Sequence, residues 1–198
     1  MIMRATSLAV FALLIPHLAS ARTAPAPAQQ KLPHISAEPQ QTSATFGNWV
    51  LRCTRIGHGA LASQLCEVAE VLRAQGQQAP LAQVAIGRAT GGAGARGKPA
   101  GLRLTLLLPV NLSFDQAPRL AMSADDAHPI ELTWRRCIPS GCFADAAISN
   151  EIVARLRQRT KPMRILFKNA SEQNVVLPLS PLGLPQALDA FTREATAK

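Results

Sequence analysis

Short stretches in which large apolar residues alternate with polar ones recur along most of this chain. Alternation of this kind places one face of a strand in a core and the other in solvent. The stretches follow one another at intervals of about ten residues, with Pro, Gly, Asn or Asp between them, which is typical of a β-sandwich or barrel. We predict strands over residues 46–53, 65–73, 81–87, 101–110, 118–123, 130–137, 142–148, 163–169 and 174–180. Residues 65–73 also fit a helical spacing, but a cysteine and a glycine-containing turn flank them, so we interpret them as a strand.

Two further segments have the period of an amphipathic helix. Residues 149–159 begin at a capping residue, Ser149 or Asn150. The two faces of this helix carry Ile152, Val153 and Leu156 on one side and Arg155, Arg157 and Arg159 on the other. Residues 184–195 predict a terminal helix that directs Leu184, Leu188 and Phe191 inward. The pattern as a whole predicts a domain that is mainly β with two helices.

The first 21 residues form a segment of their own. A basic Arg4 precedes an apolar run over residues 5–15, and a small-x-small motif ends at Ala21. This order is typical of a secretory signal peptide over residues 1–21, cleaved after Ala21. The apolar run is shorter than the roughly 20 residues that a membrane span needs, and no later segment approaches that length. We therefore expect no transmembrane segment in the mature chain.

The segment after the predicted cleavage point differs in composition from the rest. Residues 22–45 are rich in Pro, Ala and Gln and contain few large apolar side chains. Such a segment cannot bury enough apolar surface to offset the loss of chain entropy, so we expect a disordered leader. A single folded domain is then expected over residues 46–198, which is near the commonest domain size.

Four cysteines lie beyond the predicted cleavage point, where an oxidising compartment favours disulfides. Cys137 and Cys142 bracket a Pro-Ser-Gly turn, and Cys53 and Cys66 bracket a longer, hairpin-like connection. Three pairings are possible and the sequence does not select one; we favour Cys53 with Cys66 and Cys137 with Cys142, because near neighbours meet most often. On the chain-entropy model these closures contribute roughly 3 and 2 kcal/mol. A redox role is the alternative, but C-x-x-x-x-C departs from the C-x-x-C spacing of redox pairs.

The chain is strongly basic. It carries 21 Lys and Arg against 12 Asp and Glu, a formal net charge of +9, and cleavage would remove only Arg4 and leave +8. Such a charge attracts anionic lipid head groups, sulfated glycans or nucleic acid, although a solvated basic face is the simpler alternative. Nucleic acid is disfavoured because the chain has no tyrosine and no aromatic-rich strand for stacking bases. The densest basic run supplies the candidate residues for an anionic surface: Arg155, Arg157, Arg159, Lys161 and Arg164.

The stretch GGAGARGKPAG, residues 91–101, contains both G-x-x-x-x-G-K and G-x-G-x-x-G, two patterns of phosphate-binding loops. The first pattern requires Ser or Thr after Lys98, where this chain has Pro99. Both patterns also need a following helix, whereas residues 101–110 predict a strand. We therefore interpret the stretch as a flexible connection between strands.

Candidate catalytic groups are scarce. His34 lies in the leader, His58 lies between glycines, and His128 lies in a predicted loop, and none has the spacing of a metal site. No serine lies in a G-x-S-x-G elbow, and the adjacent Asp125 and Asp126 would point to opposite faces of a strand. We therefore expect a protein without catalytic residues, cofactor or metal.

Two motifs are specific enough to suggest a family: F-G-x-W-x-x-x-C over Phe46 to Cys53, and C-x-x-x-G-C-x-A over residues 137–144. Together with LTLLLPVNL between them and VVLPLSPLGLPQALDAF near the end, they resemble the invasion-associated locus B family of exported bacterial proteins. The resemblance covers about residues 46–192. The chain departs from the family at Val110, where a glycine usually follows the proline, and at Leu184, where a phenylalanine is usual.

This resemblance implies an immunoglobulin-like β-sandwich with one or two short helices and disulfides, exported to the periplasm or to the cell surface or secreted. Family members are linked to bacterial entry into host cells. The leading hypothesis is thus a non-enzymatic envelope or secreted protein that promotes association with host cells. Its partner would be an unknown protein or an anionic surface, such as a host membrane, a glycan or the bacterial envelope. The alternative is a periplasmic housekeeping or envelope-assembly module with no host role.

Overall fold

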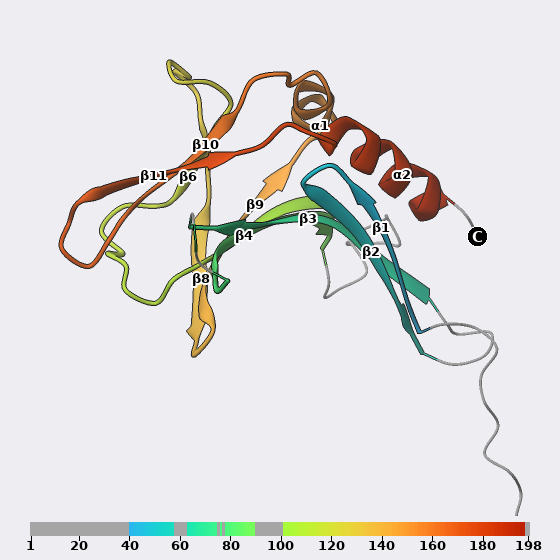
Figure 1. Cartoon of the computed structure of the whole chain (residues 1–198), viewed down its shortest axis with the longest axis horizontal. Coiled ribbons are helices and arrows are strands. Elements are labelled where there is room, and N and C mark those ends of the chain that lie inside the picture. Colours follow the sequence, from blue (N-terminus) through green and yellow to red (C-terminus); the bar gives the residue numbers. More distant parts are fainter. Residues whose placement is uncertain (1–39, 58–62, 75, 77, 90–100, 197–198) are drawn as a thin grey trace, which may run out of the picture. The chain divides into compact units, whose positions relative to one another are not determined.

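The computed structural model describes residues 40–57, 63–74, 76, 78–89 and 101–196 (Figure 1). All of them belong to one compact unit, Glu38–Lys198. Several sequence predictions lie outside the described residues: the signal peptide, the leader up to residue 39, His34, His58 and residues 91–100 of the glycine-rich stretch.

The larger of two sheets consists of seven strands in the order β1 (Gln41–Phe46), β2 (Trp49–Ile56), β3 (Ser63–Arg73), β4 (Pro80–Arg88), β5 (Leu102–Leu108), β9 (Gly141–Ile148) and β8 (Thr133–Ile138). Every neighbouring pair is antiparallel. The first five strands are neighbours in both sequence and space. The glycine-rich stretch therefore leads from β4 into β5, a strand rather than the helix that a phosphate-binding loop requires.

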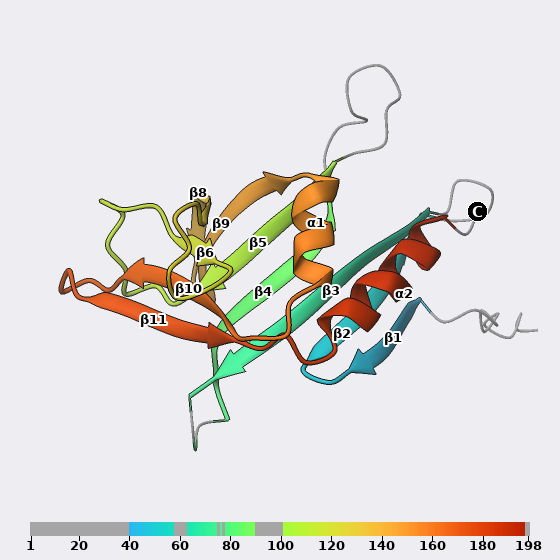
Figure 2. The same cartoon turned by 90° about the horizontal axis from the view of Figure 1, so that it is seen from above.

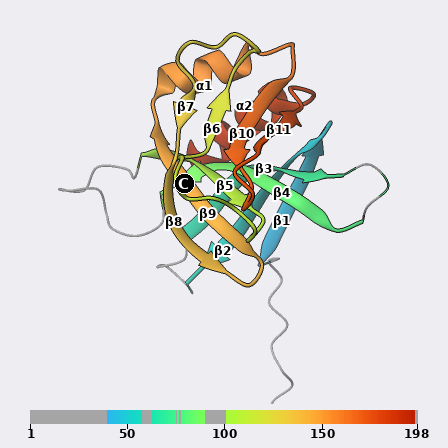
Figure 3. The same ribbon diagram turned by 90° about the vertical axis from the view of Figure 1, so that its left-hand side faces the viewer.

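The smaller sheet consists of β11 (Asn174–Leu179), β10 (Met163–Lys168), β6 (Arg119–Ala121) and β7 (Ile130–Glu131), in that order. Two helices, α1 (Asn150–Arg157) and α2 (Leu184–Thr196), lie on the same side of the larger sheet as this smaller sheet (Figures 2 and 3). Both sheets contribute to one hydrophobic core. The predicted β-sandwich with two helices and two disulfides is confirmed.

Strand β5 shows how the alternation divides the larger sheet into two faces. Leu104, Leu106 and Leu108 are buried in the core, whereas Arg103 and Thr105 between them are half-buried on the opposite face. Each fully buried leucine contributes roughly 1.5–3 kcal/mol relative to an exposed one. We call the core side the inner face of the larger sheet and the opposite side the outer face.

The helices close the inner face. Ser149 caps α1 by accepting a hydrogen bond from the backbone N–H of Ile152 (3.4 Å). In α2 the predicted inward residues Leu184, Leu188 and Phe191 are all buried, so the leucine at position 184 does fill a core position. The turn before α2 requires glycine, because Gly183 has φ +88° and a Cβ there would lie 1.8 Å from the carbonyl oxygen of Phe46.

Two strand predictions need correction. Residues 46–53 are not one strand, since a turn at Gly47, where φ is +55°, separates β1 from β2. Strand β1 also extends the folded part to Gln41, within the segment expected to be a disordered leader. Residues 130–137 are not one strand either: the chain leaves the smaller sheet after β7, passes through the buried Leu132 and enters the larger sheet as β8.

The disulfides join Cys53 to Cys66 and Cys137 to Cys142, the pairing that we favoured from their spacing. Each bridge connects residues that lie directly opposite each other on adjacent antiparallel strands, β2 with β3 and β8 with β9. The first bridge is buried on the inner face, and the second ties down the edge strand β8. Both disulfides therefore hold the larger sheet together.

Candidate functional site

The basic run predicted as an anionic-surface site is divided by the structure. Arg155, Lys161 and Arg164 are exposed, while Arg157 and Arg159 are half-buried. Arg157 points toward α2, where its Nε lies 2.9 Å from Asp189 Oδ1 and its Nη2 donates to Thr192 Oγ1 (2.7 Å). This side chain links the two helices, so its guanidinium is already engaged within the protein.

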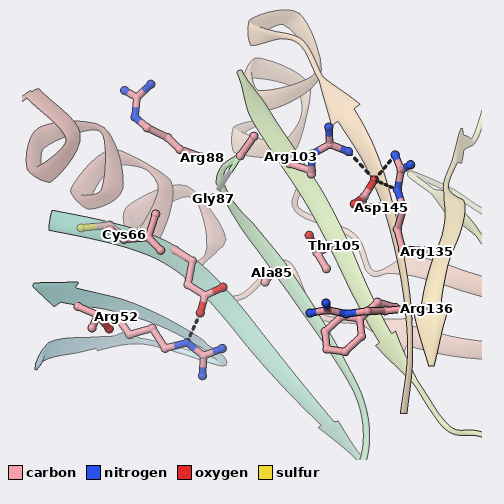
Figure 4. A pocket seen from close by; sticks show the side chains of 15 residues that line it. Arg52, Cys66, Ala85, Gly87, Arg88, Arg103, Thr105, Arg135, Arg136 and Asp145 are labelled. Atoms are coloured by element: carbon pink, nitrogen blue, oxygen red, sulfur yellow. Dashed lines mark hydrogen bonds and ion pairs between the residues drawn. The ribbon is translucent and has the colours of Figure 1, made fainter. Parts of the chain in front are cut away.

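A second basic surface, which sequence reasoning missed, lies on the outer face of the larger sheet. A groove of about 650 Å³ on this face is lined by residues of β2, β3, β4, β5, β9 and β8. Figure 1 shows β2 and β8 descending on either side of β4. No described helix or strand of the other sheet covers the groove. Figure 4 shows the side chains that line this arginine groove, chiefly Arg52, Arg88, Arg103, Arg135, Arg136, Glu67 and Asp145.

The floor of the arginine groove is low because the central strands carry small residues there. Ala85 of β4 lies opposite Thr105 of β5, and Gly87 lies opposite Arg103. At Gly87 an added Cβ would come within 3.2 Å of the Cys66 carbonyl oxygen and the Glu67 side chain, so glycine keeps this point of the floor open. Long side chains on the neighbouring strands then form the walls.

An arginine pair holds one of the two carboxylates. Asp145 Oδ1 accepts hydrogen bonds from Arg103 and from Arg135 Nε (2.8 Å). The Asp145 side chain is only 17% exposed, which strengthens both pairs relative to ion pairs in open water. Two guanidinium groups share one carboxylate, so the cluster keeps a net positive charge and its arginines are fixed in place.

The remaining walls add further positive charge. Arg52 Nε lies 2.6 Å from Glu67 Oε1, an ion pair across β2 and β3. The Arg136 guanidinium lies over the ring of Phe143, 5.6 Å from its centroid, in cation–π geometry. Arg88 borders one end of the groove, but it follows Gly87 on β4, and in Figure 4 its side chain points away from the other arginines. The other four described arginines against two carboxylates leave an excess of two positive charges on the outer face.

This surface had a weak signal in the sequence. Its arginines stand singly or in pairs on different strands, at alternating positions such as Arg52 and Arg103, rather than in one run. Reading outward-facing positions strand by strand would have flagged them, but their neighbours across the sheet follow only from the strand order. The sequence prediction instead selected the basic residues in and after α1, because they form the densest basic run in the chain.

A buried acid lies on the opposite side of the same sheet. Glu70 of β3 is 3% exposed, and its Oε1 accepts a hydrogen bond from Asn48 Nδ2 (3.4 Å). Burial raises the pKa of Glu70 to about 7, because the hydrogen bonds from Asn48 and the Ser180 backbone offset only part of the desolvation cost. Oε2 has no hydrogen-bond partner in the described part of the chain. Glu70 borders a cavity of about 340 Å³ between β3 and the end of β11.

The described residues contain no group of three or more His, Cys, Asp or Glu side chains that could hold a metal ion. His128 lies in an exposed turn, where its backbone N–H and that of Met122 donate to the two carboxylate oxygens of Asp126. All four cysteines are engaged in disulfides. Within the described ranges, no helix combines the length and apolarity needed to cross a membrane.

The fold and the groove together define a disulfide-linked β-sandwich protein with a basic, open sheet face. Residues 49–192 match the family model described as "Invasion associated locus B (IalB) protein", and the chain belongs to this family. The family resemblance read from the two cysteine motifs is thus confirmed. A search of curated proteins found no match.

Among solved structures, the chain is similar to the crystal structure of invasion associated protein B from Bartonella henselae. The TM-score is 0.60 at 19% sequence identity, and the match covers 79% of this chain and 99% of that one. At this identity the similarity supports the fold.

Proposed function

We propose that this chain is an exported, non-enzymatic protein of the bacterial envelope that promotes association with host cells by binding an anionic partner. The observation that carries the proposal is the arginine groove: a sheet face that no described helix or strand covers, with two positive charges in excess among the described residues. Charge of one sign in a concave site concentrates field lines and raises the local concentration of an oppositely charged ligand. The family to which the chain belongs supplies the link to invasion.

Export is supported by two independent features. The sequence begins with the pattern of a signal peptide, and the domain contains two disulfides, which form and persist in oxidising compartments. A protein in this location is able to reach envelope polymers directly and, if it is on the surface or secreted, host cells.

Host association is tested with a deletion strain and a strain complemented with the intact gene, both added to cultured host cells. We expect fewer adherent bacteria for the deletion strain and recovery on complementation. Protease treatment of intact cells, followed by immunoblotting, gives the location. Equal adherence of both strains, with the protein protected from protease and the envelope weakened by the deletion, would instead support a periplasmic housekeeping or envelope-assembly module.

A further inference from the structure

We infer that the arginine groove is a binding site for a linear polyanionic polysaccharide, whose sulfate or carboxylate groups pair with the arginines of the outer face. The inference deepens the proposed binding function, on which it rests, by naming the site and the class of ligand. Three properties of the groove carry it: its length, the nature of its charges and the shape of its walls.

The length of the groove fits an extended chain rather than a small anion. Its arginines extend from Arg52 on β2 to Arg136 on β8. These strands are five steps apart in the sheet, which is roughly 24 Å at the usual spacing of about 4.8 Å per strand. A single phosphate or sulfate would contact one end of such a row, whereas a polymer with regularly spaced anions would contact arginines along the whole row.

The positive charges of the groove are all guanidinium groups, which bind carboxylate, sulfate and phosphate oxygens through two parallel hydrogen bonds. Arg103 and Arg135 are held in place by Asp145, and Arg52 is held by Glu67. Side chains that are already fixed lose less conformational entropy when they bind a ligand. The two carboxylates therefore position three of the arginines and cancel only part of their positive charge.

The same features disfavour nucleic acid. Single-stranded nucleic acid is held by stacking its bases on exposed aromatic rings. Phe143 is the one aromatic residue among the described residues that line the groove, and the Arg136 guanidinium lies over its ring. Bases entering the groove would have no free aromatic face, while a sugar polymer does not need one.

The hollow shape disfavours a membrane surface. A flat bilayer would touch the rims at β2 and β8 first and would leave Arg103 and the floor at Thr105 away from the head groups (Figures 1 and 4). A single polymer chain is narrow enough to reach the floor. Shape and charge together therefore favour a polysaccharide.

The test is a calorimetric titration of the full mature chain with a heparin hexasaccharide and, separately, with a polygalacturonate oligomer of similar length. Arg135→Glu combined with Arg136→Glu reverses the two exposed charges that β8 contributes to the groove. Lys161→Glu combined with Arg164→Glu is the matched control, because it makes the same change of net charge at two exposed positions of the other basic region. We expect the groove variant to bind the preferred oligomer about tenfold more weakly or worse, and the control to change affinity by about twofold or less.

A third variant tests the groove without changing charge. Thr105→Ile fills the floor with a larger β-branched residue, a type enriched in strands, so it should weaken binding by about threefold or more while circular dichroism and thermal unfolding remain close to wild type. This variant keeps the test valid if the double charge reversal impairs folding. Preference for the sulfated or for the carboxylated oligomer distinguishes a host glycan from an envelope polysaccharide, and either preference supports the inference.

Three results would overturn the inference: no binding of either oligomer, equal losses in the groove variant and the control, or binding to phosphatidylglycerol vesicles that is as tight and as sensitive to the groove variant. The proposed function is judged separately by bacterial adherence. If purified protein binds oligomers through the groove but the deletion strain adheres normally, the host role fails and the site remains. If adherence depends on the gene but the purified protein binds neither oligomer, the host role remains and the site fails.

Discussion

The two faces of the larger sheet are built from alternate residues of the same strands and yet serve different purposes. On β3, Val68 and Glu70 lie on the inner face beneath the helices, while Glu67 lies on the outer face and pairs with Arg52. Apart from Glu70, the inner face buries mainly apolar side chains under the helices and the smaller sheet; the outer face is charged, and no described helix or strand covers it. Substitutions at neighbouring positions on one strand should therefore affect stability at one position and binding at the next.

The largest effect is expected from cutting away an inner-face side chain. Leu106→Ala removes a fully buried leucine and leaves a cavity in the core, so the free energy of unfolding should fall by about 2–5 kcal/mol. Its neighbour Thr105→Ala, on the outer face, should change it by less than about 1 kcal/mol. Urea denaturation of both variants makes the comparison. Similar losses at the two positions would show that the outer face is also part of the packed core.

The next largest effect is a pH dependence of stability, which should arise from Glu70 on the inner face of β3 and not from Glu67 on its outer face. The pKa of Glu70 is about 7, well above its ordinary value of 4.5, so the folded state binds a proton more tightly than the unfolded state. The stability from the neutral form is complete below pH 4.5 and is lost as the pH rises through about 7, a loss of about 3 kcal/mol at 1.36 kcal/mol per unit.

Glu70→Gln should therefore raise the free energy of unfolding above pH 7 and leave it nearly unchanged at pH 4.5. Glu67→Gln, the same substitution on the outer face, removes the ion pair with Arg52 and should give no such gain. Denaturation of the wild type and both variants across this pH range measures the differences. A pH dependence that survives in Glu70→Gln would assign it to other groups.

Much of the fold was accessible from the sequence because apolar alternation reports directly which side chains a strand buries. Leu104, Leu106 and Leu108 show this on β5. The prediction failed where one apolar run serves two strands. At Gly47 the chain turns back within an uninterrupted pattern, and at Leu132 it changes sheets while its side chain stays buried. Periodicity alone does not report such breaks; the Gly-Asn pair after Phe46 was the available turn signal.

The arginine groove was harder to predict from the sequence, for a different reason. It joins residues that lie far apart in the sequence, such as Arg52, Arg103 and Arg136, and their proximity depends on the strand order. That order places β9 directly beside β5 and β8 beside β9, skipping β6 and β7 of the smaller sheet, which lie between β5 and β8 in the chain. The sequence of a single strand does not predict which arginines lie near one another in the sheet. A run of basic residues on one helix, by contrast, is directly visible in the sequence.

An effect of about the same size is expected from removing the buried disulfide, which lies between the strands that carry Arg52 and Glu67. Cys53→Ala with Cys66→Ala should lower the free energy of unfolding by about 3 kcal/mol on the chain-entropy model, measured by denaturant unfolding. Because both cysteines project to the inner face, oligosaccharide affinity should stay within about twofold at temperatures where the variant is folded. Loss of binding in a folded variant would show that the two faces are coupled through β2 and β3.

The smallest effect lies wholly on the outer face. Phe143→Leu keeps an apolar side chain in the groove but removes the ring beneath Arg136, a contact worth about 0.5–1 kcal/mol at an exposed site. Stability should fall by no more than this amount, since Phe143 is only half-buried. Without the ring Arg136 is less well fixed, so oligosaccharide affinity should fall by about two- to threefold in calorimetric titration. If affinity is unchanged while stability falls, the ring under Arg136 supports the sheet and does not prepare the arginine for a ligand. The opposite pattern, weaker binding at constant stability, is the one that a dedicated binding face requires.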